Sequence, residues 1–142
     1  MSQSIQDILS KTRLSTDEFT YRIVHLPANA ITPAAALIAE IGAPFLTLIA
    51  DRDEVTLVLS QEDYDEYQNR LRDHTISEIE YRLITFDIVL EHTLVGFLAE
   101  ISRSLAQAQI PIMAFSSFER DHILIPESQF AQAMQILSEI AK

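Results

Sequence analysis

Residues 94–125, LVGFLAEISRSLAQAQIPIMAFSSFERDHILI, carry the pattern that decides the fold. In the first part of this stretch, apolar residues recur at the period of one buried helix face: Leu94, Phe97, Leu98, Ile101, Leu105 and Ala108. After Gln109 the pattern changes to two short apolar runs, 110–115 and 123–125, which predict strands covered by that helix. The polar segment 116–121 between them is expected to turn at the edge of the sheet.

A related pattern occurs earlier in the chain, at an offset of about 66 residues. At this offset Leu57, Leu59, Tyr64 and Leu71 align with Ile123, Ile125, Phe130 and Leu137. We therefore expect two copies of one strand-helix-strand-strand-helix unit. The expected organisation is an N-terminal helical segment, residues 1–17, a first half, residues 18–74, and a second half, residues 78–142.

Capping residues indicate where the helices begin and end. Thr32 is the expected N-cap of the first long helix, and Gly42 its C-terminal stop. Ser60 and Ser128 are the expected N-caps of the helices that close the two halves. The acidic segment 51–54 is expected to be a hairpin turn.

Six strands can be counted, whereas two complete βαββαβ units need eight. The six are residues 19–26, 45–50, 55–59, 80–90, 110–115 and 123–125. Each half then lacks its final strand, and an unpaired sheet edge invites association with another chain. Either the halves share strands in one continuous sheet, or a partner chain covers an open edge. We therefore expect tight side-by-side halves and a symmetric homodimer.

Composition excludes several classes of function. The net charge is −11, with 21 acidic and 10 basic residues, which repels nucleic-acid phosphates. The chain has no cysteine, so disulfides and thiolate metal sites are excluded. Gly42 and Gly96 are the only glycines, too few for a dinucleotide or phosphate loop. No partner nucleic acid and no cofactor are therefore expected.

No feature of the sequence predicts a membrane, metal or catalytic site. The N-terminus lacks a signal peptide, and no apolar run reaches the length of a membrane span, which indicates a cytoplasmic protein. The four histidines lack metal-ligand spacing, and the acidic residues of segment 51–54 lack the glycine and distal Glu of a calcium loop. No serine lies in a nucleophile context. An enzyme is the least supported class of function.

Three parts of the sequence resemble the ACT-domain family. They are LEHTLVGFLA at 90–99, the run 110–115, and SSFERDHILI at 116–125. The branch it resembles has a Ser-Thr-aromatic-x-Thr-Asp-aromatic-(Ile/Val)-Leu-Val strand pair and includes small tandem ACT proteins and cytosolic arginine sensors of eukaryotes. The resemblance covers residues 80–142 well and 19–71 more loosely.

The resemblance implies an α+β fold of two ferredoxin-like (βαββαβ) ACT domains in tandem, with antiparallel sheets and helices on one face. It also implies amino-acid binding or regulation without chemistry by the domain itself. Four positions depart from the family pattern: His92 replaces an aromatic or apolar residue, and three threonines are replaced by Val95, Ser117 and Arg120. These departures bear on the identity of the ligand rather than on the fold.

The start of the central helix is one expected half of a ligand site. Its free N–H groups and positive dipole end suit a carboxylate. From the resemblance, Leu94, Val95, Gly96 and Phe97 are expected to contact the ligand, mostly through the backbone. The alternative is that Gly96 only lets the helix pack near a strand.

The turn between the last two strands is the expected other half. Ser116 and Ser117 end one strand and Asp121 begins the next, so their side chains can converge on the ammonium and polar groups of a ligand. The alternative is that these residues only satisfy the turn backbone.

The sequence therefore leaves two readings of function. The first is a non-enzymatic amino-acid-binding regulatory protein, in which a small ligand at the junction of halves or subunits favours one arrangement that a partner reads. The second is an interaction or assembly module that kept the fold and has no ligand.

Overall fold

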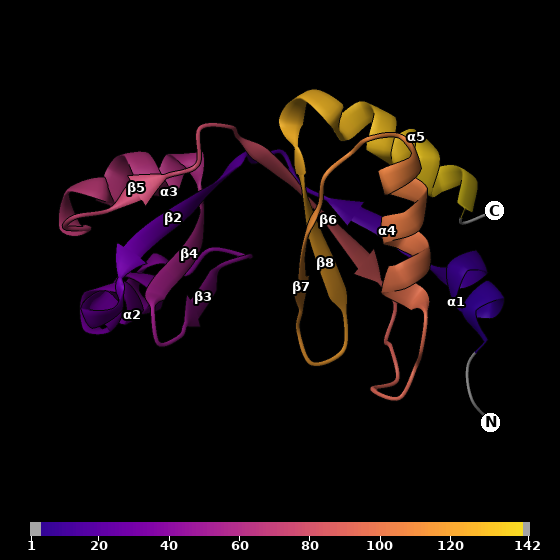
Figure 1. Ribbon diagram of the computed structural model, residues 1–142, viewed down its shortest axis with the longest axis horizontal. Helices are drawn as coiled ribbons and strands as arrows, with labels where there is room; N and C mark the ends of the chain where they lie inside the picture. Colours follow the sequence, from indigo (N-terminus) through magenta and orange to yellow (C-terminus); the bar gives the residue numbers. More distant parts are fainter. Residues whose placement is uncertain (1–3, 141–142) are drawn as a thin grey trace. The chain divides into compact units, whose positions relative to one another are not determined.

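The computed structural model describes residues 4–140, which form two compact units. Unit 2 consists of residues 19–80, and unit 1 consists of the described parts of residues 1–18 and 81–142. Unit 1 thus joins the start of the chain to its second half (Figure 1).

Unit 1 is an antiparallel four-stranded sheet with helices packed on it. Its elements are α1 (Ile5–Lys11), β1 (Arg13–Thr16), β6 (Tyr81–Asp87), α4 (Phe97–Gln107), β7 (Met113–Ser116), β8 (Asp121–Pro126), a 3-10 turn (Glu127–Gln129) and α5 (Phe130–Ile140). The strand order is β1-β6-β8-β7, and all neighbours are antiparallel.

Unit 2 has the same strand order from a contiguous segment. Its elements are β2 (Tyr21–Pro27), a 3-10 turn (Ala28–Ala30), α2 (Ile31–Ile41), β3 (Thr47–Ala50), β4 (Glu54–Ser60), α3 (Gln61–Tyr67), a 3-10 turn (Gln68–Arg70) and β5 (Thr75–Ile76). The order is β5-β2-β4-β3, again antiparallel. The fourth strand follows α3 in unit 2, whereas in unit 1 it comes from the front of the chain.

The expectation of six strands is wrong, because residues 4–140 contain eight. The two additional strands are β1, which lies in the segment predicted to be helical, and β5, which lies between the two predicted halves. Both are short edge strands, whose backbones pair with a neighbour while their side chains remain partly or fully exposed. They therefore lack the apolar alternation by which a strand is recognised in sequence.

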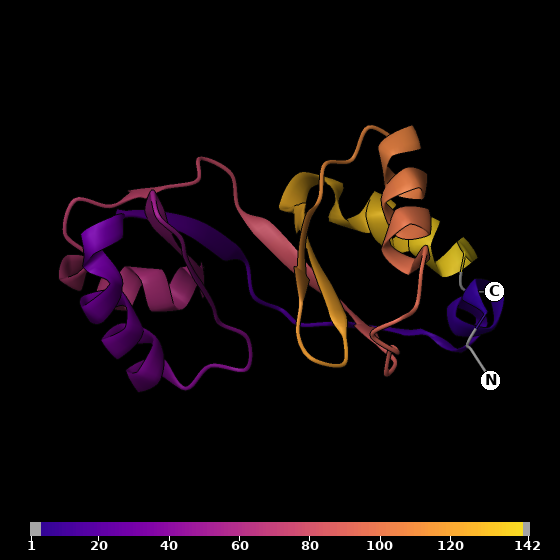
Figure 2. The same ribbon diagram turned by 60° about the horizontal axis from the view of Figure 1, so that its bottom comes forward.

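The core of unit 1 confirms the helix face predicted from the spacing. Phe97, Ile101 and Leu105 of α4 are buried in one apolar cluster with residues of β6, β8, α5 and α1. Figures 1 and 2 show α4 and α5 on the same side of this sheet. Full burial of each such side chain contributes roughly 1.5–3 kcal/mol.

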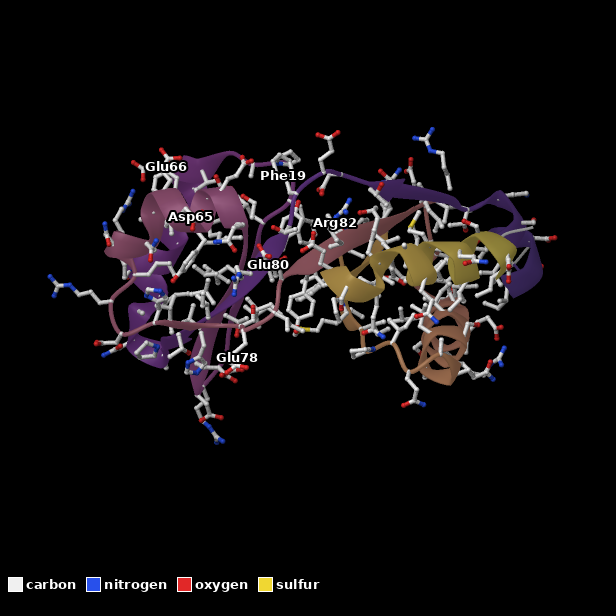
Figure 3. All side chains as sticks on the ribbon, turned by 90° about the horizontal axis from the view of Figure 1, so that it is seen from above. Phe19, Asp65, Glu66, Glu78, Glu80 and Arg82 are labelled. Carbon is white, nitrogen blue, oxygen red and sulfur yellow. The ribbon has the colours of Figure 1, made fainter. Side chains whose placement is uncertain are left out.

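The core of unit 2 is a second apolar cluster. Leu57 and Leu59 of β4, Leu37 of α2 and Tyr64 of α3 are buried in it. The opposite side of α3 is acidic and carries the exposed Asp65 and Glu66, which Figure 3 labels on this helix. One face of α3 is therefore buried in the core and the other is acidic and exposed.

Two predicted caps and the hairpin turn are confirmed. Ser60 Oγ accepts from Asp63 N at 3.1 Å at the start of α3. Gly42 ends α2 in the left-handed conformation, with φ of 65°. In the segment 51–54, the Asp51 carboxylate accepts from two following backbone N–H groups at 2.8 and 2.9 Å.

Two other caps are wrong. α2 begins at Ile31, and a 3-10 turn precedes it directly after Pro27, so Thr32 already lies inside the helix. Likewise Pro126 ends β8 and a 3-10 turn starts at once, which places Ser128 within helical backbone rather than at a cap. No helix in residues 4–140 is long and apolar enough to cross a membrane.

Candidate functional site: a cavity at the start of α4

A cavity of about 400 Å³ lies in unit 1 beside the start of α4. Its lining comes from two segments, residues 90–99 before and within α4 and residues 116–121 of the β7–β8 turn. Leu90 N donates to Glu119 O at 2.8 Å, which holds the two segments together. They meet at the end of the unit opposite the β8–α5 connection (Figure 1).

The start of α4 opens toward this cavity. The helix begins at Phe97, three residues later than the apolar period suggested, because Gly96 has a φ of 98° and cannot continue a helix. No side chain caps it, and its first intrahelical bond runs from Glu100 N to Gly96 O at 3.0 Å. Phe97, Leu98 and Ala99, whose N–H groups precede that bond, line the cavity.

Gly96 is required by its backbone conformation rather than by crowding. A Cβ atom added there would lie 3.7 Å from the side chain of Ile5, which is ordinary van der Waals contact. That neighbour belongs to helix α1, so the alternative of close packing against a strand does not describe this position.

The β7–β8 turn is closed by its own serines. Ser117 donates to Arg120 O through both its N–H, at 2.9 Å, and its Oγ, at 3.1 Å. Ser116 Oγ donates to Asp121 Oδ1 at 2.6 Å. Ser117 thus hydrogen-bonds to the backbone of the turn, as expected if these residues serve only the turn. Asp121 instead accepts a hydrogen bond from the side chain of Ser116. A carboxylate has about four acceptor positions, so Asp121 can accept further bonds from a ligand.

His122 of β8 connects the turn to the neighbouring strand β6. Its Nδ1 lies 2.8 Å from Thr85 Oγ1, and its Nε2 lies 3.1 Å from Ser117 Oγ. Burial lowers its pKa below 6.5, the nearby Asp121 opposes this shift, and Arg120 adds to it. Since Ser117 gives its proton to Arg120 O, the neutral ring donates from Nε2 to Ser117 and accepts from Thr85 at Nδ1.

His92 joins the two segments in a way that sequence reasoning missed. Its Nε2 donates to Phe118 O at 2.7 Å, and its ring meets the Phe118 ring edge-on with centroids 4.5 Å apart. Phe118 itself is 79% exposed and lines the cavity. The one signal in the sequence was that His92 stands where the family pattern has an aromatic or apolar residue.

Asp87 links the turn to the front of the chain. Its Oδ1 accepts from Arg120 Nε at 3.0 Å and its Oδ2 from the Arg13 guanidinium at 3.1 Å. The hydrogen bond from Arg120 lowers the pKa of Asp87 below 3.8, desolvation opposes the shift, and the charges of both arginines add to it. Arg120, which lines the cavity, is therefore oriented by β1 and β6.

The structure brings together six of the seven residues expected at the site. Leu94, Gly96, Phe97, Ser116, Ser117 and Asp121 line the cavity. Val95 does not line it and is 83% exposed. Within residues 4–140, no group of three or more His, Asp or Glu side chains is placed to hold a metal ion.

A comparison with known protein families finds a match for most of the second half of the chain. The family model of the ACT domain matches residues 78–139. This segment is an ACT domain. It contains both segments that line the cavity, so the cavity lies within the ACT domain.

Solved structures share the fold over nearly the whole chain. A protein of unknown function from Vibrio cholerae has a TM-score of 0.76 and 22% identity, covering 97% of this chain and 96% of that one. An Agrobacterium tumefaciens protein has a TM-score of 0.71 and 20% identity, covering 92% and 89%. The ligand-free regulatory subunit of aspartate kinase from Thermus thermophilus has a TM-score of 0.70 and 14% identity, covering 92% and 99%. No curated protein matches the sequence significantly.

Gly96→Ala should destabilise the ACT domain by about 1–2 kcal/mol, because an L-residue is strained at positive φ. The measurement is urea unfolding, and the matched control repeats the substitution in an Ile5→Ala background. If backbone conformation is the cause, the cost persists after the neighbour is truncated. Disappearance of the cost in that background would show that crowding by Ile5 was responsible.

Asp87→Asn should flatten the acid dependence of stability. Because the folded-state pKa of Asp87 is lowered, its carboxylate stabilises the fold above its unfolded pKa, and this contribution is lost as pH falls through the folded value. Urea midpoints measured from about pH 6 to pH 3 should therefore decline less in the variant than in the parent. Asp53→Asn at the exposed hairpin tip is the control, and an equally steep decline in both variants would contradict the prediction.

Proposed function

We propose that the ACT domain binds a free amino acid in the cavity at the start of α4 and that the chain is a non-enzymatic regulatory protein. The observation that supports this most is the shared lining: the uncapped helix start and Asp121 face one space of about 400 Å³. A helix start favours an anion and a carboxylate favours a cation, which are the two charged groups of an amino-acid zwitterion.

In the proposed complex the ligand carboxylate accepts from the free N–H groups of Phe97, Leu98 and Ala99. The ligand ammonium donates to Asp121, and Ser116 and Ser117 hold the turn in place. Leu94 and Gly96 complete the lining. Val95 has no part in this arrangement because it lies outside the cavity.

We further propose that unit 2 is a second, ACT-like module, so that the two domains stand in tandem. Its strand order equals that of unit 1, and the repeat at an offset of about 66 residues supports a duplication. The regulatory subunit of aspartate kinase covers 92% of this chain, beyond the segment that the family model matches.

Regulation would follow from differential binding. A ligand shifts an equilibrium between two arrangements only as far as it binds one of them more tightly than the other. The His92–Phe118 contact and the Leu90–Glu119 hydrogen bond join the cavity's two segments, so a ligand held by both segments favours the joined state. A partner that reads this state would complete the regulatory pathway in the cytoplasm.

The second candidate function is an interaction or assembly module without a ligand. The observation that favours it is the pair of exposed apolar side chains near the cavity, Val95 and Phe118, which are 83% and 79% exposed. Exposed apolar side chains of this size are used at protein interfaces.

A thermal-shift screen of the free amino acids separates the two functions. A ligand at 100 times its dissociation constant stabilises the folded state by about 2.7 kcal/mol, which corresponds to about 5–10 °C for a chain of this size. Asp121→Asn should reduce the shift strongly because it removes the charge that pairs with the ammonium, whereas Asp53→Asn should leave it unchanged. No shift with any amino acid would favour the interaction module.

We also propose a homodimer, although the missing-strand argument no longer applies because both fourth strands lie within the chain. Support now comes from β3 and β7, which end their sheets and expose Ile49 and Met113 to 44% and 38%. Such edges pair readily with a second chain. Equilibrium sedimentation at tens of micromolar protein should therefore give the dimer mass, and a monomer under these conditions would overturn this proposal.

A further inference from the structure

Unit 2 contains a second cavity, of about 240 Å³, next to the start of α2. Its walls are apolar and come from β2, the first turns of α2 and the segment after α3: Leu26, Ala30, Pro33, Ala34 and Leu71. Two arginines, Arg70 and Arg72, complete its lining. The volume is below the range of about 300–1,000 Å³ typical of drug-sized ligands, so a fitting ligand is small.

The charge at this cavity is opposite to that of its surroundings. Residues 19–80 contain eleven acidic residues, no lysine and four arginines. Two of the four arginines line this cavity. None of the described residues that line this cavity is acidic, so its lining favours an anion over a cation.

The segment that carries the arginines is held in place by His74. Its Nδ1 donates to Leu71 O at 2.5 Å, and its Nε2 accepts from the Tyr64 hydroxyl at 2.7 Å. Asp73, which lies between Arg72 and His74 in the chain, adopts a positive φ of 59°. Surrounding contacts hold a non-glycine residue in such a conformation. Arg72 therefore extends from a backbone whose position is fixed before any ligand arrives.

The two arginines differ in what they already bind. Arg70 is paired with Glu40, and its guanidinium lies 5.9 Å from the centre of the Tyr67 ring. Arg72 makes no ion pair or side-chain hydrogen bond within residues 4–140. Arg72 is thus the group that can pair with a ligand's anionic end without breaking an existing contact.

Unit 1 shows what occupies the matching place in the ACT domain. There the N-cap residue of α4, Gly96, lies against Ile5, and Ile8 and Leu9 of α1 are buried in the same cluster. Figure 1 shows α1 beside the start of α4. Unit 2 has no counterpart of α1 among its elements, and the N-cap residue of α2, Ala30, lines the cavity instead.

We propose that the unit 2 cavity binds a small monocarboxylate with an apolar body, distinct from the amino acid proposed for the ACT domain. The aliphatic walls bury the body of the ligand, and Arg72 pairs with its carboxylate. An ammonium group has no acidic partner in the lining, so the cavity selects carboxylates without an α-amino group.

The test is a titration of the full-length, nitrogen-15-labelled protein with phenylacetate, followed by amide chemical shifts. Saturable shifts are expected at Ala30, Ala34, Leu71 and Arg72, and not at residues 96–99 of the ACT domain. Phenylacetamide lacks the negative charge that pairs with Arg72, and acetate lacks the apolar ring that the cavity walls bury. Each should therefore bind at least about tenfold more weakly than phenylacetate.

Matched variants assign the charge. Arg72→Gln should weaken phenylacetate binding about tenfold, whereas Arg52→Gln, at an exposed hairpin tip, should leave it unchanged. Equal binding of phenylacetate and phenylacetamide, equal binding by both variants, or no saturable shift at Ala30 and Leu71 would each overturn the proposal. The amino-acid screen tests the ACT-domain cavity through Asp121, whereas the phenylacetate titration tests the unit 2 cavity through Arg72. Failure of either proposal therefore leaves the result of the other experiment unchanged.

Discussion

The pairing of β1 with β6 is the interaction on which the rest of unit 1 depends. Four residues near the N-terminus, Arg13–Thr16, pair antiparallel with residues 84–87, which lie 68 to 74 positions later in the chain. Within unit 1, β6 thus has two neighbours, β8 and this strand. With it, the ACT domain acquires the fourth strand that the segment 78–139 does not contain.

The same strand connects the fold to the candidate site. It places Arg13 on Asp87, and Asp87 in turn orients Arg120 of the β7–β8 turn. The preceding helix α1 brings Ile5 against Gly96, at the start of α4. Both segments that line the cavity are therefore braced by the first part of the chain.

The sequence was sufficient for the parts of the fold that bury apolar side chains. The α4 period, the central strands β4 and β8 and the cap at Ser60 were all predicted, because burial and local capping leave a pattern in sequence. β1 and β5 were not, since their pairing uses backbone groups and their side chains are largely exposed. Ser128 was misassigned because 3-10 backbone directly after Pro126 takes the place of a cap.

Some residues of the candidate site could likewise be identified from the sequence, and others could not. Gly96, Ser117 and Asp121 were identified from residue type and family resemblance, and they do line one cavity. His92 and Arg120 were noted only as departures from a pattern. Their contacts, to Phe118 O and to Asp87, join residues 26 and 33 positions apart in the chain, and no local spacing encodes such pairs.

The most direct test of this account is native-state hydrogen exchange of the full chain, read at β6. Alternate amides of an antiparallel strand point to its two neighbours. If β1 completes the sheet, the amides of residues 84–87 that point away from β8 are protected together with those that point toward it. Fast exchange of the alternate set, as at an open edge, would show that the front of the chain does not complete the ACT domain.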